Sequence, residues 1–177
     1  MRVLGIDPGT ATTGYGVVAR EGDGAVSLLE CGVIRTEARA PLPERLRDIY
    51  HGVVEVIDRL EPDIVAVEGI FYAKNVKTTV VLGHARGAIL LAATLRDLPI
   101  VEYSPAEVKN AIVGTGRATK EQVQFMVQRL LRLKHPPRPN DAADGVAVAL
   151  THCYAGTLAS VRPPMHFAPA SIRGIGR

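Results

Sequence analysis

Four acidic side chains of this 177-residue chain occur where a strand is expected to end or a helix to begin. Asp7 and Glu68 each follow an apolar run typical of a buried strand. Asp141 and Asp144 are three residues apart, so they share one face of the first turn of a helix, where the helix dipole favours negative charge. Because ligands gather at the carboxyl ends of strands in an open α/β sheet, we expect the four carboxylates to converge.

Convergence of four carboxylates has a chemical consequence. Two carboxylates 4 Å apart repel by about 4 kcal/mol at an effective dielectric constant of 20. Mg²⁺ or Mn²⁺ would offset this repulsion, because both ions prefer hard oxygen ligands. Two such ions about 4 Å apart stabilise the attacking and leaving oxygens of a phosphodiester displacement. The acids therefore predict a two-metal site for phosphodiester hydrolysis, although the residues do not decide which acid binds which ion.

Each acid also has a simpler explanation when it is considered alone. Asp7 precedes a Pro-Gly pair and could serve only to form a turn. Asp141 and Asp144 could serve only to compensate a helix dipole. Glu68 is harder to explain in this way, because a charged side chain at the edge of a sheet core is seldom buried without a partner.

The positive charge is concentrated in one part of the chain. Residues 1–108 carry a formal charge of −4, whereas residues 109–140 carry +6. Such a block is the expected footprint of a phosphate backbone, although a solvated helix face is the alternative. Lys120 could either stabilise developing phosphate charge or make a plain backbone contact. The block contains Lys109, Arg117, Lys120, Arg129, Arg132, Lys134 and Arg138, with Glu121 as its one acid.

Aromatic and basic residues alternate just after Glu68. Phe71 and Tyr72 are followed by Lys74 and Lys77 on a segment expected to be a loop. An aromatic ring that stacks on an unpaired base contributes about 1–3 kcal/mol. We therefore predict DNA contacts for Phe71, Lys74 and Lys77, with packing of one ring in the core as the alternative.

The elements that must position these residues can be predicted from apolar periodicity. An antiparallel meander of three strands comes first, and helices then alternate with strands, which is typical of a mixed α/β sheet with helices on its faces. Ser104, Thr119 and Asn140 are predicted to cap helices. The predicted strands are 2–6, 13–19, 26–35, 63–67 and 99–103, and the predicted helices are 42–60, 78–95, 105–113, 120–133 and 141–154.

Length and composition favour one cytoplasmic domain. Hydrophobic residues make up 47% of the chain and charged residues 22%, as in soluble globular proteins. No apolar run reaches the roughly 18 residues of a membrane span, and no secretory segment is recognisable at the N-terminus. Cys31 and Cys153 lack metal-ligand spacing and are expected to be free thiols. We expect a domain over 1–155 and a basic tail over 156–177, with the small-residue helix 78–95 as a candidate dimer interface.

Four segments of the chain together resemble the RuvC-type Holliday-junction resolvases. They are GIDPGT with TGYGV within 5–17, VEGIFYAKN at 67–75, VKNAIVGTGRATKEQVQ at 108–124 and NDAADGVAVALTHC at 140–153. The resemblance implies a ribonuclease H-like fold with a five-stranded mixed sheet flanked by helices. It also implies an Mg²⁺-dependent endonuclease, with Mn²⁺ as a substitute, that nicks four-way DNA junctions symmetrically in recombination and repair.

The resemblance further implies roles for individual residues and for partners. Asp7, Glu68, Asp141 and Asp144 match the family's metal-binding catalytic acids. Phe71 matches an aromatic that stacks on unpaired bases, and Lys109 and Lys120 match lysines near the scissile strand. A homodimer and a branch-migration motor complex are the implied protein partners.

Three alternatives remain open at the level of the sequence. The first is a ribonuclease H-like nuclease that cuts RNA–DNA hybrids or flaps, and the second is a junction-binding module without catalysis. An ATPase of the actin type also begins with an Asp-x-Gly-Thr turn, but its two domains need about twice this length. Metal-dependent nicking of defined substrates separates the first two from a resolvase.

Overall fold

The computed structural model describes residues 1–69 and 76–155. Three of the residues singled out above, Phe71, Tyr72 and Lys74, lie outside the described residues, as does the predicted tail 156–177. The predicted roles of these residues therefore remain predictions.

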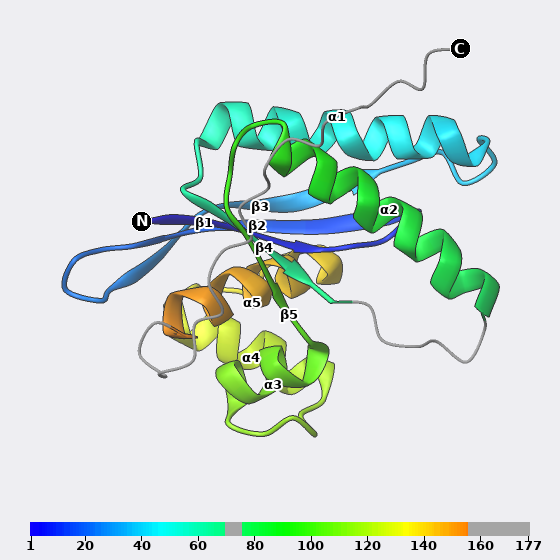
Figure 1. Ribbon diagram of the computed structural model, residues 1–177. Helices are drawn as coiled ribbons and strands as arrows, with labels where there is room; N and C mark the ends of the chain where they lie inside the picture. The colour runs from blue at the N-terminus through cyan, green and yellow to red at the C-terminus, as the bar shows by residue number, and fades with distance from the viewer. Residues whose placement is uncertain (70–75, 156–177) are drawn as a thin grey trace, which may run out of the picture.

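A five-stranded mixed sheet forms the centre of the molecule (Figure 1). Its strand order is β3-β2-β1-β4-β5, in which β1 pairs antiparallel with β2, and β2 antiparallel with β3. The pairs β1–β4 and β4–β5 are parallel. The strands are β1 (Arg2–Asp7), β2 (Thr12–Arg20), β3 (Val26–Arg35), β4 (Ile64–Glu68) and β5 (Ile100–Tyr103). The predicted meander and mixed sheet are confirmed.

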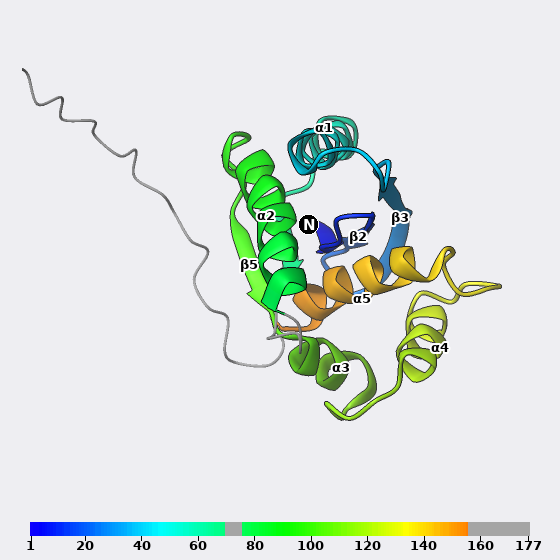
Figure 2. The ribbon, with the colours of Figure 1, turned by 90° about the vertical axis from the view of Figure 1, so that its right-hand side faces the viewer.

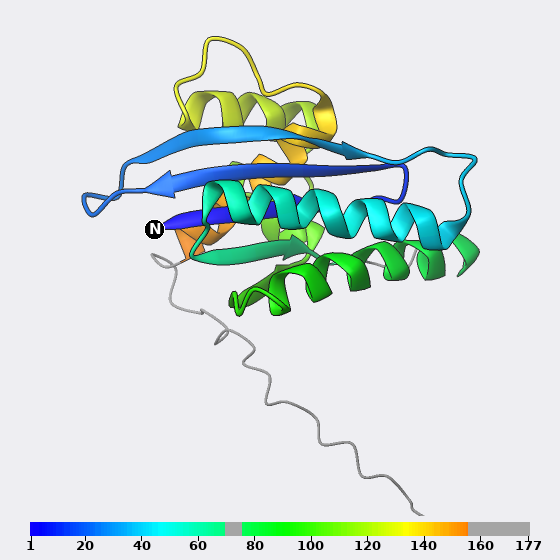
Figure 3. The same ribbon diagram turned by 90° about the horizontal axis from the view of Figure 1, so that it is seen from above.

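Helices cover both faces of this sheet (Figures 1 and 2). Helices α1 (Leu42–Leu60) and α2 (Val76–Thr94) pack against one face of the sheet, and their buried side chains form an apolar cluster with those of the strands. On the other face α5 (Asn140–Ala155) lies on the strands, with α3 (Pro105–Val113) and α4 (Lys120–Leu130) packed against it. Seen from above, α4 runs away from the end of the sheet at which α5 begins (Figure 3).

Helix α5 lies directly on the strand backbones because glycines remove the side chains between them. A Cβ atom on Gly5 would lie 2.2 Å from the Ala149 backbone nitrogen, and one on Gly16 would lie 2.7 Å from the Cα of Val146. From the helix side, a Cβ on Gly145 would lie 2.6 Å from the Cα of Tyr15. Backbone contacts as close as these cannot relax by rotation of a side chain, so they fix the height of α5 above β1 and β2.

Two of the predicted helix caps are confirmed, and the third differs. Ser104 and Thr119 each accept a hydrogen bond from the backbone N–H three residues on, within complete capping boxes. Asn140 is instead the first residue of α5, and the carbonyl of Pro139 accepts from the N–H of Ala142. The helix therefore begins one residue earlier than predicted.

Helix α4 ends at Leu130, three residues before the predicted end. The backbone turns at Arg132, where φ is +52°, a left-handed conformation that an α-helix cannot contain. The Gln128 side chain donates to the carbonyls of Leu133 and Lys134, so it satisfies groups that a longer helix would have paired.

Helix α2 has an unusual surface. Among the described residues it is the one helix whose length and apolar composition match a membrane span, with 22% of the apolar window buried. Lys77 and Arg86 interrupt its apolar run, and Arg86 pairs with Glu102 on β5. Much of its apolar surface faces outward, which requires an explanation other than the core of a single chain.

Candidate metal-binding active site

The parallel pairing of β1 and β4 brings the first two acids together. Ile6 is the register partner of Val67, so Asp7 and Glu68 emerge side by side from the carboxyl ends of neighbouring strands. Both side chains are half-buried, and their carboxyl groups lie close enough that each changes the pKa of the other. Two carboxyl groups in such contact must share a proton or a cation.

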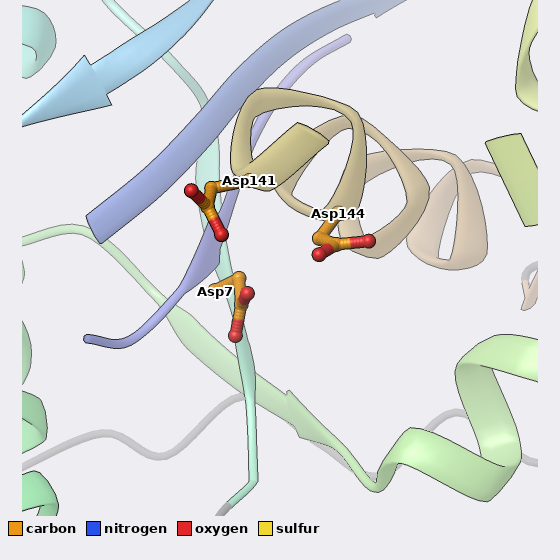
Figure 4. Close-up of side chains that lie close together, drawn as sticks. All are labelled: Asp7, Asp141 and Asp144. Carbon is orange, nitrogen blue, oxygen red and sulfur yellow. The ribbon is translucent and has the colours of Figure 1, made fainter. Parts of the chain in front are cut away.

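Helix α5 brings the other two acids to the same place. Asp7, Asp141 and Asp144 each offer a carboxylate oxygen, and these three oxygens lie within 4.8 Å of one another. Figure 4 shows Asp141 and Asp144 on the first turns of α5, with Asp141 directed towards Asp7 at the end of β1. Asp7 thus contacts both groups of acids, with Glu68 on one side and the α5 pair on the other.

The raised pKa values of Asp7 and Glu68 show that it is unfavourable for these neighbouring acids to be ionised together. Burial, together with repulsion by Glu68 and Asp144, raises the pKa of Asp7 to about 8. Burial and the charge of Asp144 likewise raise the pKa of Glu68. An arrangement of buried carboxylates that resists ionisation is stabilised by a divalent cation, whose charge favours the ionised forms. Four hard oxygen donors fit Mg²⁺ or Mn²⁺.

Two lysines complete the site from the α3 and α4 side. The Nζ atom of Lys120 lies 2.7 Å from Oδ2 of Asp144, and this hydrogen bond raises the pKa of the lysine. Lys120 is the first residue of α4, directly after the Thr119 cap, so the capping box sets where its side chain starts. Lys109 on α3 lines the same cavity and lies close enough to lower the pKa of Glu68.

These residues surround a cavity of about 230 Å³ at the end of the sheet. One part of its wall is charged and the rest is apolar, which keeps the carboxylates in a partly dry environment. Its apolar residues escaped the sequence interpretation, because their 3.6-residue periodicity identifies only a buried helix face. The lining residues are Asp7, Glu68, Pro105, Val108, Lys109, Lys120, Val123, Asp144 and Ala147.

The other predicted contact residues lie away from this cavity. Arg117 is exposed in the turn between α3 and α4, and Lys77 is exposed in the first turn of α2. Neither lines the cavity. Both remain predictions as DNA contacts, and their exposure leaves them accessible to a phosphate backbone.

Comparison with known proteins identifies a matching family and similar sequences. The family model for crossover junction endodeoxyribonuclease RuvC matches residues 3–152. The chain is 54% identical to the crossover junction endodeoxyribonuclease RuvC of Moorella thermoacetica over 153 residues, which is 86% of this chain and 90% of that protein. It is 50% identical to that of Chloroflexus aggregans over 154 residues, covering 87% of this chain and 93% of the relative.

A solved structure agrees with these sequence matches. Thermus thermophilus RuvC in complex with Holliday junction substrate superimposes with a TM-score of 0.84 at 41% identity. The superposition covers 89% of this chain and 96% of that one. The expected ribonuclease H-like architecture is confirmed.

Proposed function

The chain belongs to the RuvC family of crossover junction endodeoxyribonucleases, and from that premise we propose that its four carboxylates cut Holliday junctions by symmetric paired nicks. The enzyme is a metal-dependent hydrolase of DNA phosphodiester bonds that acts in recombination and repair. The observation that carries the assignment to this site is the 4.8 Å cluster of Asp7, Asp141 and Asp144 beside Glu68.

Asp7, Glu68, Asp141 and Asp144 would hold two Mg²⁺ ions, for which Mn²⁺ can substitute. Bound ions supply an activated water and neutralise charge on the leaving oxygen. Asp7 is placed to serve both ions, because it contacts Glu68 on one side and the α5 acids on the other. The backbone contacts under α5 hold these oxygens in place before any ion arrives.

The two lysines assist the acids in different ways. Lys120 is ion-paired with Asp144 and is two-thirds exposed, so it can turn towards a phosphate once a cation satisfies that carboxylate. Positive charge placed where negative charge develops lowers the barrier of a phosphodiester displacement. Lys109 lines the same cavity and binds the scissile strand. Farther from the cavity, Arg117 and Lys77 contact other phosphates of the junction, and Phe71 and Lys74 contact DNA next to the cut.

The outward face of α2 supports a homodimer. Val76, Val80 and Leu91 are 77%, 53% and 52% exposed, and between them Gly83 and Gly87 have no atoms near their Cβ positions. These residues recur at spacings of three and four, so they form one stripe on the helix. Two such stripes can pack closely, because glycines let helix backbones approach. A dimer would present two equivalent sites to the two strands that must be cut.

The remaining partners follow from membership of the family. Because a resolvase must reach chromosomal DNA, we propose that the protein is located in the cytoplasm. A branch-migration motor is the expected protein partner, since it brings the crossover to the sequence that is cut.

The test is cleavage of a labelled four-way junction beside matched duplex, flap and RNA–DNA hybrid, with Mg²⁺ or with EDTA. Paired symmetric nicks in the junction, formed only with metal, are the expected result. Cleavage of the hybrid or the flap in preference to the junction would reassign the substrate. Tight junction binding without any cleavage would contradict the catalytic role of the four acids.

A further inference from the structure

The segment that joins α4 to α5 combines a fixed backbone with free positive charge. Arg132, Lys134 and Arg138 are exposed, and none of them forms an ion pair within the described part of the chain. The sequence has no acid between Glu121 and Asp141 to neutralise them. We call residues 131–139 the basic connector.

Six cations elsewhere in the described part of the chain form ion pairs, namely Arg2, Arg47, Arg59, Arg86, Arg96 and Lys120. Arg59 pairs with Glu30, Arg86 with Glu102 and Arg96 with Asp58, all on the β3, α1 and α2 side of the molecule. Surface charges of this kind satisfy one another and leave little attraction for a polyanion. The unpaired cations of the basic connector therefore make a local positive field that the rest of the protein does not cancel.

The backbone of the basic connector is held in place. The Gln128 side chain donates to the carbonyl oxygens of Leu133 and Lys134 at 3.3 and 3.0 Å. Leu131 and Pro137 are buried, whereas the three basic side chains of the connector are exposed to solvent. Binding through a preformed backbone avoids the entropy cost of ordering a free loop.

The position of the basic connector relative to the acid cluster indicates which part of a DNA junction it would contact. Arg138 comes three residues before Asp141, and α5 begins directly after Pro139. The cavity is lined by Lys109 and Lys120 but by none of the residues of the basic connector, so the connector lies outside the cavity and next to the start of α5. Figure 2 shows α3 below α5 and the loop before α5 extending outward beyond α4.

We propose that the basic connector is a second phosphate-binding surface, which holds the junction arm that leaves the active site past Asp141. Lys109 and Lys120 contact the strand at the cut, and Arg132, Lys134 and Arg138 contact the backbone of the arm beyond it. This inference rests on the proposed function, because it presupposes that a DNA junction occupies the site.

The first experiment measures the salt dependence of junction binding without divalent metal. Each lost phosphate contact lowers the slope of log K against log salt by about 0.9. The triple variant R132Q/K134Q/R138Q should lose about two to three units of slope. Arg2→Gln is the control for the loss of one paired charge, because Arg2 begins β1 at the end opposite Asp7 and pairs with Glu61.

A second control separates position from net charge. Arg129 belongs to the same basic block, but its guanidinium lies over the Phe125 ring on α4 and is therefore already engaged within the protein. Arg129→Gln should change the slope by less than half a unit. Equal losses per charge for R129Q and the triple variant would overturn the proposal, because long-range attraction alone would then explain the binding.

Neutral methylphosphonate linkages identify the phosphates involved. Placed in turn along each arm, they should abolish the difference between the parent and the triple variant at a few neighbouring positions on one arm. A difference that persists at every position would overturn the proposal. A parent that neither binds nor cuts junctions would instead contradict the proposed function, so the two failures are distinguishable.

Discussion

The backbone of Gly14 lies directly against the carbonyl oxygen of Asp141. A Cβ atom on Gly14 would lie 1.8 Å from that oxygen, which is far inside any allowed contact. Gly14 is the register partner of Asp7 across the β1–β2 pair. One glycine thus sets the distance between two acids that are 134 residues apart in the sequence.

Gly14→Ala should therefore displace the start of α5 and loosen the acid cluster. We expect a stability loss of about 1–3 kcal/mol from overpacking and a several-fold rise in the Mg²⁺ concentration that gives half the maximal thermal shift. Gly22→Ala is the control, since nothing lies within 4 Å of its Cβ position. An unchanged Mg²⁺ requirement in a folded G14A protein would show that this contact does not position Asp141.

Asp7→Asn should abolish cleavage and preserve junction binding. The change removes a carboxylate that contacts both groups of acids, so we expect a loss of about 10³-fold or more in the cleavage rate, equivalent to about 4 kcal/mol. Single-turnover cleavage and binding of the same labelled junction are the measurements. A folded D7N protein that still cuts at the parent rate would remove Asp7 from the mechanism.

Mg²⁺ should raise the melting temperature of the parent protein. Cation binding to the folded state relieves carboxylate repulsion and adds about 2.7 kcal/mol when the ion is at 100 times its Kd. The D7N variant should show a much smaller shift across the same titration in scanning fluorimetry. Equal shifts in the two proteins would place the bound ion somewhere other than the acid cluster.

Val80→Asp should convert a dimer to a monomer. Val80 is 53% exposed on the α2 stripe, and a buried carboxylate there would face its own copy across the interface. Sedimentation velocity measures the change, and Ser27→Asp on exposed β3 serves as the control. A parent protein that is monomeric at assay concentrations would refute the role of the stripe.

His152 should make the protein less stable in mild acid. Burial and the nearby Arg20 lower the pKa of this histidine, and its Nδ1 lies 2.8 Å from the Tyr103 hydroxyl. Because the folded state resists protonation, its contribution to stability is complete above the unfolded pKa of about 6.5 and is lost as the pH falls below that value.

His152→Gln should therefore flatten the pH dependence of the unfolding free energy between pH 7 and 5. Urea denaturation at several pH values measures the effect, with His51→Gln on the exposed face of α1 as the control. A parallel loss of stability in parent and H152Q proteins would assign the acid sensitivity to other groups.

The sequence by itself determined the elements and the chemical character of the site. Apolar periodicity and capping residues such as Ser104 and Thr119 act within a few residues of the chain, so they predict helices and strands locally. The four carboxylates were predictable because strand ends and helix starts converge in an open sheet. Local patterns did not predict where α4 ends. The apolar periodicity continues to Leu133, but the helix ends at Leu130 and the Gln128 side chain donates to the carbonyls that follow.

Only the tertiary structure decided how these parts meet. The ion pair of Lys120 with Asp144, the apolar cavity wall and the contact of Gly14 with Asp141 all join residues that are distant in the chain. No local pattern encodes such contacts, because they depend on the order of the strands and on how closely α5 approaches the sheet. The sequence supplies the acids, and packing brings the carboxylate oxygens of Asp7, Asp141 and Asp144 within 4.8 Å of one another.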